Sequence, residues 1–319
     1  MESIVALDAH GVNPGDLSWE KFESLGRLSV YAHCKREEIV PRAQKTRAVL
    51  VDMLPLGESE FAELPDLRYV GLFATGYDHI DIEAAGRRGI AVTNVPEYST
   101  PSVAQMTFAL LLNMTNRVRG YADYVADGYW RRGETFEYLD QPLVELSGKT
   151  IGILGFGPIG VAVARIAAAF GMHIIAWSRR PKPTDGLSVE WVELPDVFRR
   201  ADVVSLHLPL TEETAEIVNQ QTLSLMKPSA FLVNTARGGL VNDTDLAEAL
   251  VEGRPAGAAL DVLGPEEPPA PENPLLSAPN CIITPHVAWA TRAARARCLR
   301  EAASNLESYL YGEMRNRIV

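Results

Sequence analysis

The sequence has few cysteines, and none of them stands in a pattern that binds metal. Its cysteines are Cys34, Cys281 and Cys298, and no two of them form a C-x-x-C pair. Such a sparse, odd set gives no zinc signature and fits a reducing compartment, where disulfides are rare. We therefore expect a cytoplasmic protein without a metal site.

Positive charge is also scarce, and no long hydrophobic run is present. Asp and Glu number 41 against 30 Lys and Arg, which gives a formal net charge of -11. Binding to a phosphate backbone needs a basic surface, so we expect no nucleic-acid partner. No apolar run is long enough to span a bilayer, and residues 1–10 lack the basic and apolar regions of a signal peptide. We expect neither export by that route nor a membrane partner.

Short apolar runs alternate with helical patterns along the chain, which at 319 residues is long enough for two domains. The first part has strand patterns at 3–7, 27–31, 48–53 and 67–73. The second part has strand patterns at 150–154, 173–177, 202–206, 230–234, 257–261 and 281–284. Strands that alternate with helices form parallel sheets. The predicted fold class is α/β, with two Rossmann-like parallel-sheet domains, one flavodoxin-like and one dinucleotide-binding, and a cleft between them.

Two helical patterns suggest where the domains begin and end. Prolines at positions 96 and 101 precede a long helical pattern over 102–118, which suits a hinge. A strong helical pattern over 291–310 is expected to return to the first domain. We expect a substrate domain in residues 1–98, a dinucleotide-binding domain in 99–286 that includes the hinge helix and a dimerisation arm, and a returning C-terminal helix in 287–319.

The expected arm, residues 121–146, is rich in aromatic side chains. These are Tyr121, Tyr124, Tyr129, Trp130, Phe136 and Tyr138. Aromatic residues are enriched in interfaces between subunits, so we interpret the arm as a contact with a second copy and expect a homodimer. The alternative is an arm that packs on its own domain.

The most informative motif follows the strand pattern at 150–154. It consists of Gly155, Phe156, Gly157, Pro158, Ile159 and Gly160, a G-x-G-x-x-G series that opens a helical pattern. The first glycine permits a tight turn, the second lets the backbone approach a pyrophosphate, and the third lets the helix pack on the sheet. The helix N-terminus offers free N–H groups to the anion. A second strand pattern at 173–177 gives the spacing of a βαβ unit, so we expect a dinucleotide cofactor rather than a bare glycine turn.

The choice of cofactor depends on the residues after the second strand. An acidic residue there would accept hydrogen bonds from the adenosine ribose and repel a 2′-phosphate. The chain instead has Ser178, Arg179 and Arg180, which suit a phosphate. We therefore favour NADP(H), while NAD(H) stays possible because Asp185 could reach back. The alternative is that both arginines are ordinary surface residues.

Three residue types with complementary chemistry follow consecutive strand patterns. Arg237 follows the pattern at 230–234, Glu266 or Glu267 follows that at 257–261, and His286 follows that at 281–284. A guanidinium can hold a carboxylate and polarise the neighbouring carbonyl, and a histidine can transfer the proton that accompanies a hydride. A carboxylate beside the histidine would favour its charged form. Each residue alone is more typical of a surface or structural role, but together they predict a 2-keto acid reductase.

At this point the chain resembles the D-isomer-specific 2-hydroxyacid dehydrogenase family over nearly its whole length. The motifs in family order are residues 74–81, 94–96 with 102–105, 155–160, 226–228, 234–239, 259–262 and 284–286. The resemblance implies that Arg237 binds the substrate carboxylate and carbonyl and that His286 is the acid or base, with the glutamate as its partner. It also implies that the backbone at Thr75 and Gly76 holds the substrate carboxylate.

The resemblance further assigns cofactor contacts and a substrate class. Asp261 would approach the nicotinamide amide, and Thr235 and Ala236, in the motif that carries Arg237, would also contact the cofactor. Residues 98–100 and 286–292 are most similar to the glycerate dehydrogenase or hydroxypyruvate (glyoxylate) reductase branch. Leu54 and Trp289 would then line a pocket for a short 2-keto or 2-hydroxy acid, although Trp289 could instead be a core residue under the last helix.

The sequence departs from the family at the glutamate. The family places it five residues after the aspartate and immediately before a proline, and here these criteria select Glu266 and Glu267 respectively. We prefer Glu266, because spacing from the strand sets how far the side chain can reach. Two other functions stay open: a D-2-hydroxyacid dehydrogenase with another substrate, and a nucleotide-sensing binding protein similar to co-repressors of this fold.

Overall fold

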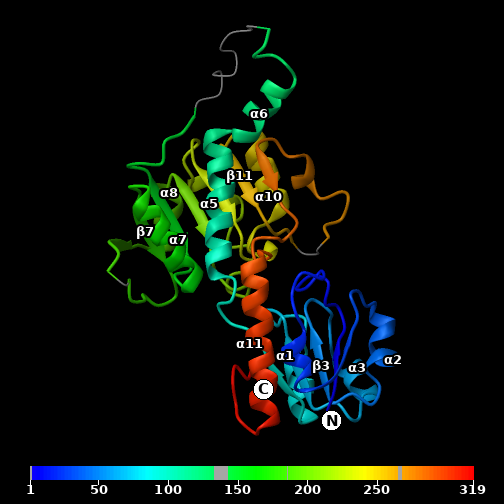
Figure 1. Cartoon of the computed structure of the whole chain (residues 1–319). Coiled ribbons are helices and arrows are strands. Elements are labelled where there is room, and N and C mark those ends of the chain that lie inside the picture. Colours follow the sequence, from blue (N-terminus) through cyan, green and yellow to red (C-terminus); the bar gives the residue numbers. More distant parts are fainter. Residues whose placement is uncertain (1, 133–142, 185, 265–267) are drawn as a thin grey trace. The chain divides into compact units, whose positions relative to one another are not determined.

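The computed structural model describes residues 2–132, 143–184, 186–264 and 268–319, and Figure 1 shows the course of the chain. The chain divides into two compact units. Unit 1 comprises Met1–Ser99 and Trp289–Val319, and unit 2 comprises Thr100–Ala288. Within the described ranges, no helix is both long and apolar enough to cross a membrane.

Unit 1 is built on a parallel sheet with the strand order β2-β1-β3-β4-β5. The strands are β1 (Glu2–Ala6), β2 (Gly26–Val30), β3 (Ala48–Val51), β4 (Tyr69–Leu72) and β5 (Ala91–Thr93). The sequence patterns predict the first four strands. They do not predict β5, because three residues are too few to show the alternation of a strand.

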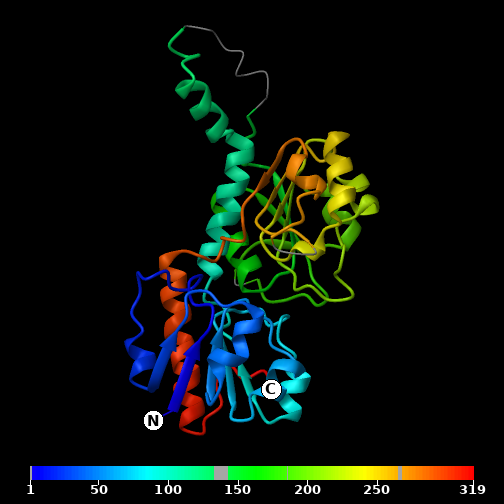
Figure 2. The same cartoon turned by 90° about the vertical axis from the view of Figure 1, so that its right-hand side faces the viewer.

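Alternation along the strands of unit 1 forms two cores, one on each face of the sheet. Ile4 and Ala6 belong to the core covered by α1 (Glu20–Glu23) and α11 (Arg292–Leu310). Val5 and Leu7 belong to the core covered by α2 (Ile39–Ala43), α3 (Glu58–Glu63) and α4 (Ile82–Arg87). Figure 2 shows α11, in red, lying against the blue strands. The last helix therefore completes the core of the unit in which the chain begins.

The segment after α11 covers the edge strand β5. The N–H of Ile318 donates to the carbonyl oxygen of Val92 at 2.8 Å. Asn305, buried in α11, donates to the carbonyl oxygen of Asn94 at 2.8 Å and accepts from the amide of Asn316 at 2.9 Å. These contacts satisfy backbone groups that an open sheet edge would leave unpaired.

Unit 2 is built on a parallel sheet with the strand order β12-β11-β10-β9-β6-β7-β8. The strands are β6 (Thr150–Leu154), β7 (His173–Trp177), β8 (Val189–Trp191), β9 (Val203–Leu206), β10 (Phe231–Asn234), β11 (Gly257–Leu260) and β12 (Cys281–Ile283). Helices α5 (Thr100–Asn116) and α7 (Pro158–Ala169) cover one face. Helices α8 (Leu194–Arg200), α9 (Gln220–Leu225) and α10 (Asp243–Val251) cover the other. The predicted fold class, with two parallel-sheet α/β domains, is confirmed.

The order of the strands reverses between β6 and β9. Strand β7 follows β6 on one side, and β9 returns to pair with β6 on the other side. In open α/β sheets, ligands bind at the carboxyl ends of strands beside such a reversal. The glycine-rich turn that follows β6 therefore lies where a dinucleotide is expected.

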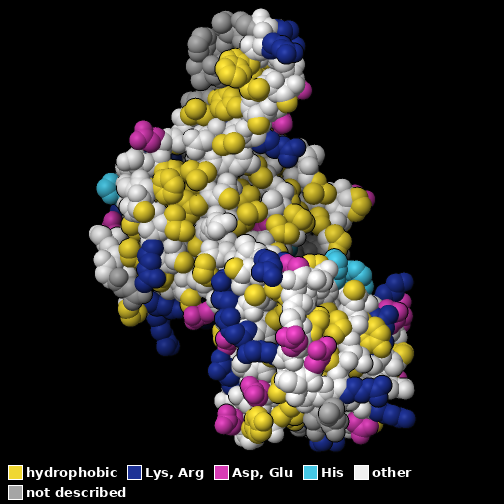
Figure 3. Space-filling view, in the orientation of Figure 1, with side chains coloured by type: hydrophobic (Ala, Val, Ile, Leu, Met, Phe, Trp, Pro, Cys, Tyr) yellow, Lys and Arg dark blue, Asp and Glu magenta, His cyan; other side chains and the backbone are white. Residues whose placement is uncertain are grey.

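The helical pattern predicted over 102–118 corresponds to α5, and a second helix that the sequence did not predict follows it. Helix α5 ends at Asn116, and α6 (Val118–Ala126) starts after Arg117, whose φ of +48° is left-handed. The ring of Tyr124 in α6 stacks on that of Tyr129, which lies beyond the helix, with centroids 5.1 Å apart. Exposed hydrophobic side chains gather on this segment (Figure 3), and Trp130 is 71% exposed. Phe136 and Tyr138 lie outside the described residues.

Candidate active site

The glycine-rich turn between β6 and α7 is closely packed on one side and open on the other. A Cβ at Gly155 would lie 2.5 Å from the carbonyl oxygen of His207, and one at Gly160 would lie 2.2 Å from that of Gly155. Gly155 also has a left-handed φ of +94°. A Cβ at Gly157, by contrast, would meet nothing within 4 Å. Open space in front of a helix N-terminus fits a phosphate group.

The other residues of the turn mainly support the fold. Phe156 is buried, and its ring centroid lies 5.3 Å from that of Trp191. Pro158 occupies the first turn of α7, where a missing N–H costs no helical hydrogen bond. Ile159 packs half-buried against the core formed with α5. Phe156 can therefore reach a dinucleotide only through its backbone.

His207, which follows β9, is a residue that the sequence analysis did not single out. Its Nε2 lies 2.9 Å from the hydroxyl of Ser205, and within the described ranges its buried Nδ1 has no hydrogen-bond partner. Burial lowers the pKa of His207 to about 3, so the ring is neutral at physiological pH. A buried nitrogen without a partner, in a residue packed on the Gly155 turn, favours a polar ligand at this edge.

The residues after β7 lie on the surface of unit 2. Ser178 donates from its hydroxyl to the carbonyl oxygen of Arg180 at 2.5 Å. The guanidinium of Arg179 lies 3.2 Å from the carboxylate of Glu213, and both side chains are exposed. Two guanidiniums thus lie exposed after β7, one of them paired with an acid. Asp185 lies outside the described residues.

Arg237 follows β10 in a turn that Asn234 holds. The buried amide of Asn234 accepts from the N–H of Ala236 at 3.0 Å and donates to the carbonyl oxygen of Arg237 at 2.9 Å. The guanidinium of Arg237 donates to the carbonyl oxygen of Ala236 at 2.8 Å. The hydroxyl of Thr235 lies 3.0 Å from that of Thr107 in α5. These bonds fix Arg237 at the carboxyl end of β10.

The loops that follow β10 and β11 touch through their backbones. A Cβ at Gly238 would lie 1.9 Å from the carbonyl oxygen of Leu263, and one at Gly264 would lie 3.0 Å from the carbonyl carbon of Gly238. Only glycine allows this approach. The chain leading to Glu266 and Glu267 therefore starts beside the Arg237 turn, but both glutamates lie outside the described residues, so the choice between them stays a prediction.

Asp261, the residue after β11, organises the loop that carries His286. Its buried carboxylate accepts from the hydroxyl of Thr284 at 2.5 Å and from the N–H groups of Val287 and Ala288 at 3.0 and 2.8 Å. The N–H of His286 donates to the carbonyl oxygen of Asp261 at 2.7 Å. His286 has a φ of +52°, which is costly outside glycine and needs such support. Asp261 therefore has a positioning role that the family resemblance did not assign.

The order of the sheet brings the candidate residues of unit 2 to one edge. Strands β10, β11 and β12 are neighbours, and Arg237, Asp261 and His286 follow them at their carboxyl ends. Next along the same edge come His207 after β9 and the glycine-rich turn after β6. This edge presents a guanidinium that can bind a carboxylate, an imidazole that can transfer a proton, and a turn that fits a pyrophosphate.

In unit 1, the candidate residues Thr75 and Gly76 lie in the loop after β4. The hydroxyl of Thr75 donates to the carbonyl oxygen of Val95 at 2.7 Å, and the amide of Asn94 donates to the carbonyl oxygen of Thr75 at 2.7 Å. The two hydrogen bonds thus fix the loop to the residues that follow β5. Leu54 lies in the loop after the neighbouring strand β3, so these candidates share one sheet edge.

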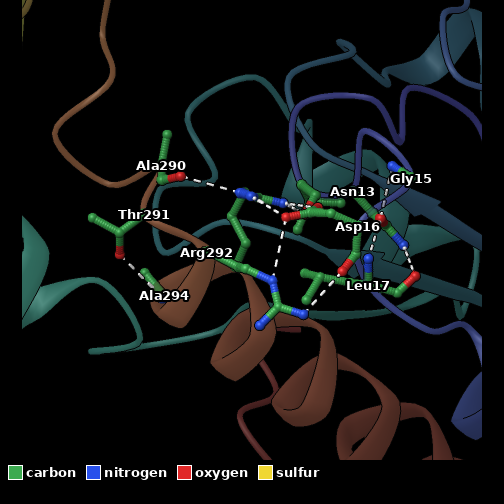
Figure 4. A network of polar contacts seen from close by, with 10 residues as sticks. Asn13, Gly15, Asp16, Leu17, Ala290, Thr291, Arg292 and Ala294 are labelled. Atoms are coloured by element: carbon green, nitrogen blue, oxygen red, sulfur yellow. Dashed lines mark hydrogen bonds and ion pairs between the residues drawn. The ribbon is translucent and has the colours of Figure 1, made fainter.

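Trp289 begins the part of unit 1 that returns after unit 2, and a buried arginine holds its surroundings. Arg295 in α11 donates twice to the carboxylate of Asp16, at 2.7 and 2.8 Å, and once to the carbonyl oxygen of Ala290 at 3.1 Å. The hydrogen bonds from Arg295 hold the pKa of Asp16 below its usual value. Figure 4 shows this network, which ties the loop after β1 to the start of α11. Trp289 directly precedes Ala290, whose carbonyl oxygen accepts from Arg295.

Comparisons with known proteins agree with this geometry. Residues 108–288 match the D-isomer specific 2-hydroxyacid dehydrogenase, NAD binding domain. The hydroxypyruvate reductase of Blautia hydrogenotrophica is 40% identical over 313 residues, which are 97% of each protein. The glyoxylate reductase of Aeropyrum pernix is 44% identical over 256 residues, 79% of this chain and 76% of that protein. A crystal structure of an NADPH-dependent glyoxylate/hydroxypyruvate reductase from Sinorhizobium meliloti has a TM-score of 0.85 and 30% identity, and the match covers 100% of this chain and 98% of that one.

The role of Asp261 can be tested by replacing it with its amide. Asp261→Asn turns an amide group toward N–H donors, so the loop over 284–288 is expected to loosen and the protein to lose about 1–3 kcal/mol of stability. Chemical denaturation measures the loss, and hydrogen exchange at Val287 and Ala288 reports the loop. The exposed Asp66→Asn serves as the control. Unchanged exchange in Asp261→Asn would contradict the positioning role.

A second prediction concerns pH and Asp52, the residue after β3. Burial, and then the charge of Asp8, raise the pKa of Asp52 from 3.8 to about 8. The folded chain therefore keeps a proton that the unfolded chain loses, and this stabilisation, complete below pH 3.8, is lost as the pH rises through about 8. Asp52→Asn cannot ionise, so its stability relative to wild type should rise between pH 4 and 8.

We expect this relative gain to be at least about 1.4 kcal/mol, the equivalent of a single pKa unit. Urea denaturation of both proteins across this pH range measures it. The exposed Asp66→Asn should show no such trend. A difference between Asp52→Asn and wild type that does not change with pH would show that Asp52 is ionised in the folded protein.

Proposed function

Because the chain belongs to the D-isomer-specific 2-hydroxyacid dehydrogenases, and is therefore an oxidoreductase, we propose that it reduces hydroxypyruvate to D-glycerate and glyoxylate to glycolate. The observation that carries this proposal is the row of Arg237, Asp261 and His286 at the ends of three neighbouring strands. Relatives named hydroxypyruvate reductase and glyoxylate reductase support the choice of short keto acids.

In the proposed reaction, unit 2 carries the chemistry. Arg237 binds the carboxylate of the keto acid and polarises the neighbouring carbonyl. His286 gives its proton to the carbonyl oxygen, and Glu266, or Glu267 in its place, favours the charged imidazole. A nicotinamide cofactor, when bound, supplies the hydride. Asp261 keeps the His286 loop in place so that the proton is given at a fixed position.

Unit 1 is proposed to be the substrate domain. The backbone at Thr75 and Gly76 would bind the substrate carboxylate, since both residues lie in a loop that hydrogen bonds fix. Leu54 and Trp289 would line the pocket for the rest of the substrate. The residues 99–286 would form the dinucleotide-binding domain, and the helix in 287–319 would complete the substrate domain.

The residues after β7 support a preference for NADP(H). A 2′-phosphate carries more negative charge than ribose hydroxyls and can accept several hydrogen bonds from guanidiniums. Arg179 and Arg180 lie exposed on the surface after β7, and Ser178 precedes them. The glycine-rich turn, with Thr235, Ala236 and Asp261 on the neighbouring strand ends, would hold the rest of the cofactor.

The proposed activity is tested by the initial rate of cofactor oxidation with hydroxypyruvate and with glyoxylate. His286→Ala is expected to lower kcat/KM by about 10²–10⁴, the usual contribution of a general acid, while leaving cofactor binding nearly intact. Arg237→Ala should chiefly raise the KM for the keto acid. The exposed Arg199→Ala is the control. Wild-type turnover that survives either of the first two changes would sink the assigned roles.

The cofactor preference is tested by running the same assay with NADPH and with NADH. We expect wild type to prefer NADPH, and the double change Arg179→Ala and Arg180→Ala to lower kcat/KM for NADPH by at least about tenfold, or about 1.4 kcal/mol, with little effect on NADH. A wild-type preference for NADH would overturn the cofactor assignment but leave the reaction intact.

A homodimer is proposed from the exposed apolar surface of the arm. Trp130 is 71% exposed, and Val118, Val125 and Tyr129 are exposed beside it. We expect Trp130→Asp to shift the protein toward monomer in sedimentation experiments. Tyr311, which is 78% exposed in unit 1, offers a matched control, because Tyr311→Asp should leave the mass unchanged. A wild-type protein that sediments as a monomer would rule the dimer out.

A further inference from the structure

Asp52 is a buried acid for which the proposed reaction has no use. It is the residue after β3 and is only 6% exposed. Its N–H donates to Asp8, but no described residue makes a hydrogen bond with its carboxyl group. Buried polar groups nearly always have a partner, so an exception needs a physical explanation.

The neighbouring acid, Asp8, is used very differently. Its carboxylate accepts from the N–H groups of Asp52, Met53 and Leu54 at 2.7, 2.7 and 3.0 Å. Asp8 therefore fixes the loop that carries Asp52 and Leu54. Burial, and then the charge of Asp8, raise the pKa of Asp52 to about 8, so the Asp52 carboxyl is neutral near pH 7. A neutral carboxyl has one O–H donor and an acceptor oxygen.

The carboxyl group of Asp52 lies directly against the backbone of Gly11, in the loop after β1. A Cβ at Gly11 would lie 2.6 Å from Oδ2 of Asp52 and 3.7 Å from the indole of Trp289. Gly11 itself is exposed. Any larger residue at position 11 would collide with the carboxyl, so glycine lets this group lie beside an exposed turn and near the indole of Trp289. The site thus combines a donor, an acceptor and an apolar wall.

The site also lies at the sheet edge that carries the proposed substrate loop. Strand β3 is the neighbour of β4, and Thr75 and Gly76 follow β4 at the same edge. Leu54, a candidate for the substrate pocket, is two residues from Asp52 and shares its anchor, Asp8. A substrate whose carboxylate binds at Thr75 and Gly76 would extend its other substituent along this edge.

We propose that Asp52 selects 2-keto acids that bear a hydroxyl group on the carbon next to the carbonyl. This inference rests on the proposed function and names the substrate class for it. A hydroxyl can donate to and accept from the neutral carboxyl, which pairs both groups. A methyl group in the same place would leave the carboxyl unpaired in the complex, and sites built to pair a hydroxyl reject such analogues strongly.

Three substrates that differ only in the substituent test the proposal: hydroxypyruvate, pyruvate and glyoxylate. Wild type should prefer hydroxypyruvate over pyruvate by more than about tenfold in kcat/KM. Asp52→Ala should lower kcat/KM for hydroxypyruvate by at least about tenfold and leave glyoxylate, which has no substituent, unchanged. Asp52→Asn, which keeps a donor and an acceptor, should retain most of the preference. The exposed Asp66→Ala is the control.

The outcomes separate the inference from the function on which it rests. Equal loss of activity with glyoxylate and hydroxypyruvate in Asp52→Ala would show a structural role and overturn the inference alone. Wild type that reduces pyruvate as well as hydroxypyruvate would do the same, and this measurement does not need a folded variant. Wild type that reduces none of the three acids would overturn the proposed function and the inference together.

Discussion

Direct contact between backbones holds the candidate active edge of unit 2 together. Neighbouring strands of a sheet lie about 4.8 Å apart, so the loops that leave them at one edge must pack against each other. At two places the contact leaves no room for a side chain: Gly155 on His207 and Gly238 on Leu263. These contacts set where the glycine-rich turn, the Arg237 loop and the chain leading to the glutamates begin. The positions of the functional side chains therefore depend on glycines, which have no side chain.

Three aspartates at strand ends show how the surroundings decide what a carboxyl group does. Asp8 and Asp261 each accept from backbone N–H groups of a loop, three in the first case and two in the second, and so they shape the chain. The carboxyl of Asp52 has no such donors. Burial, and then the charge of Asp8, raise its pKa, so it keeps its proton. Asp8 and Asp261 thus stabilise loops. Asp52 makes no such contacts, and we propose that its carboxyl group binds the substrate.

Much of this arrangement could be predicted from the sequence. The fold class was predicted from the helical pattern at 291–310 and from strand patterns such as those at 150–154 and 173–177. In such segments the spacing or the continuity of the apolar residues leaves a clear signal. Motifs with a mechanical reason, above all the glycine series, placed the turn beside a strand reversal. The three-residue strands β5 and β8 were not predicted, although the equally short β12 was.

The positioning roles were also beyond the sequence, for a different reason. Asp261 acts on residues more than twenty positions away, and Asp52 is defined by the absence of Gly11's side chain, far back in the chain. Such roles depend on which loops the order of the strands brings together, and local sequence patterns do not predict that order. The sequence marked Asp261 only through the family resemblance and did not mark Asp52, Asp8 or His207.

The pair of Arg179 and Glu213 bears on why a preference for one cofactor need not exclude the other. An exposed ion pair is worth at most about 1 kcal/mol, so a phosphate with a charge near -2 can displace Glu213 from the guanidinium. Without the phosphate, the ion pair stays formed. Breaking it costs little when a 2′-phosphate binds the guanidinium, as we propose for NADPH. The size of the preference for NADPH then depends on how much more strongly Arg179 binds the 2′-phosphate than it binds Glu213.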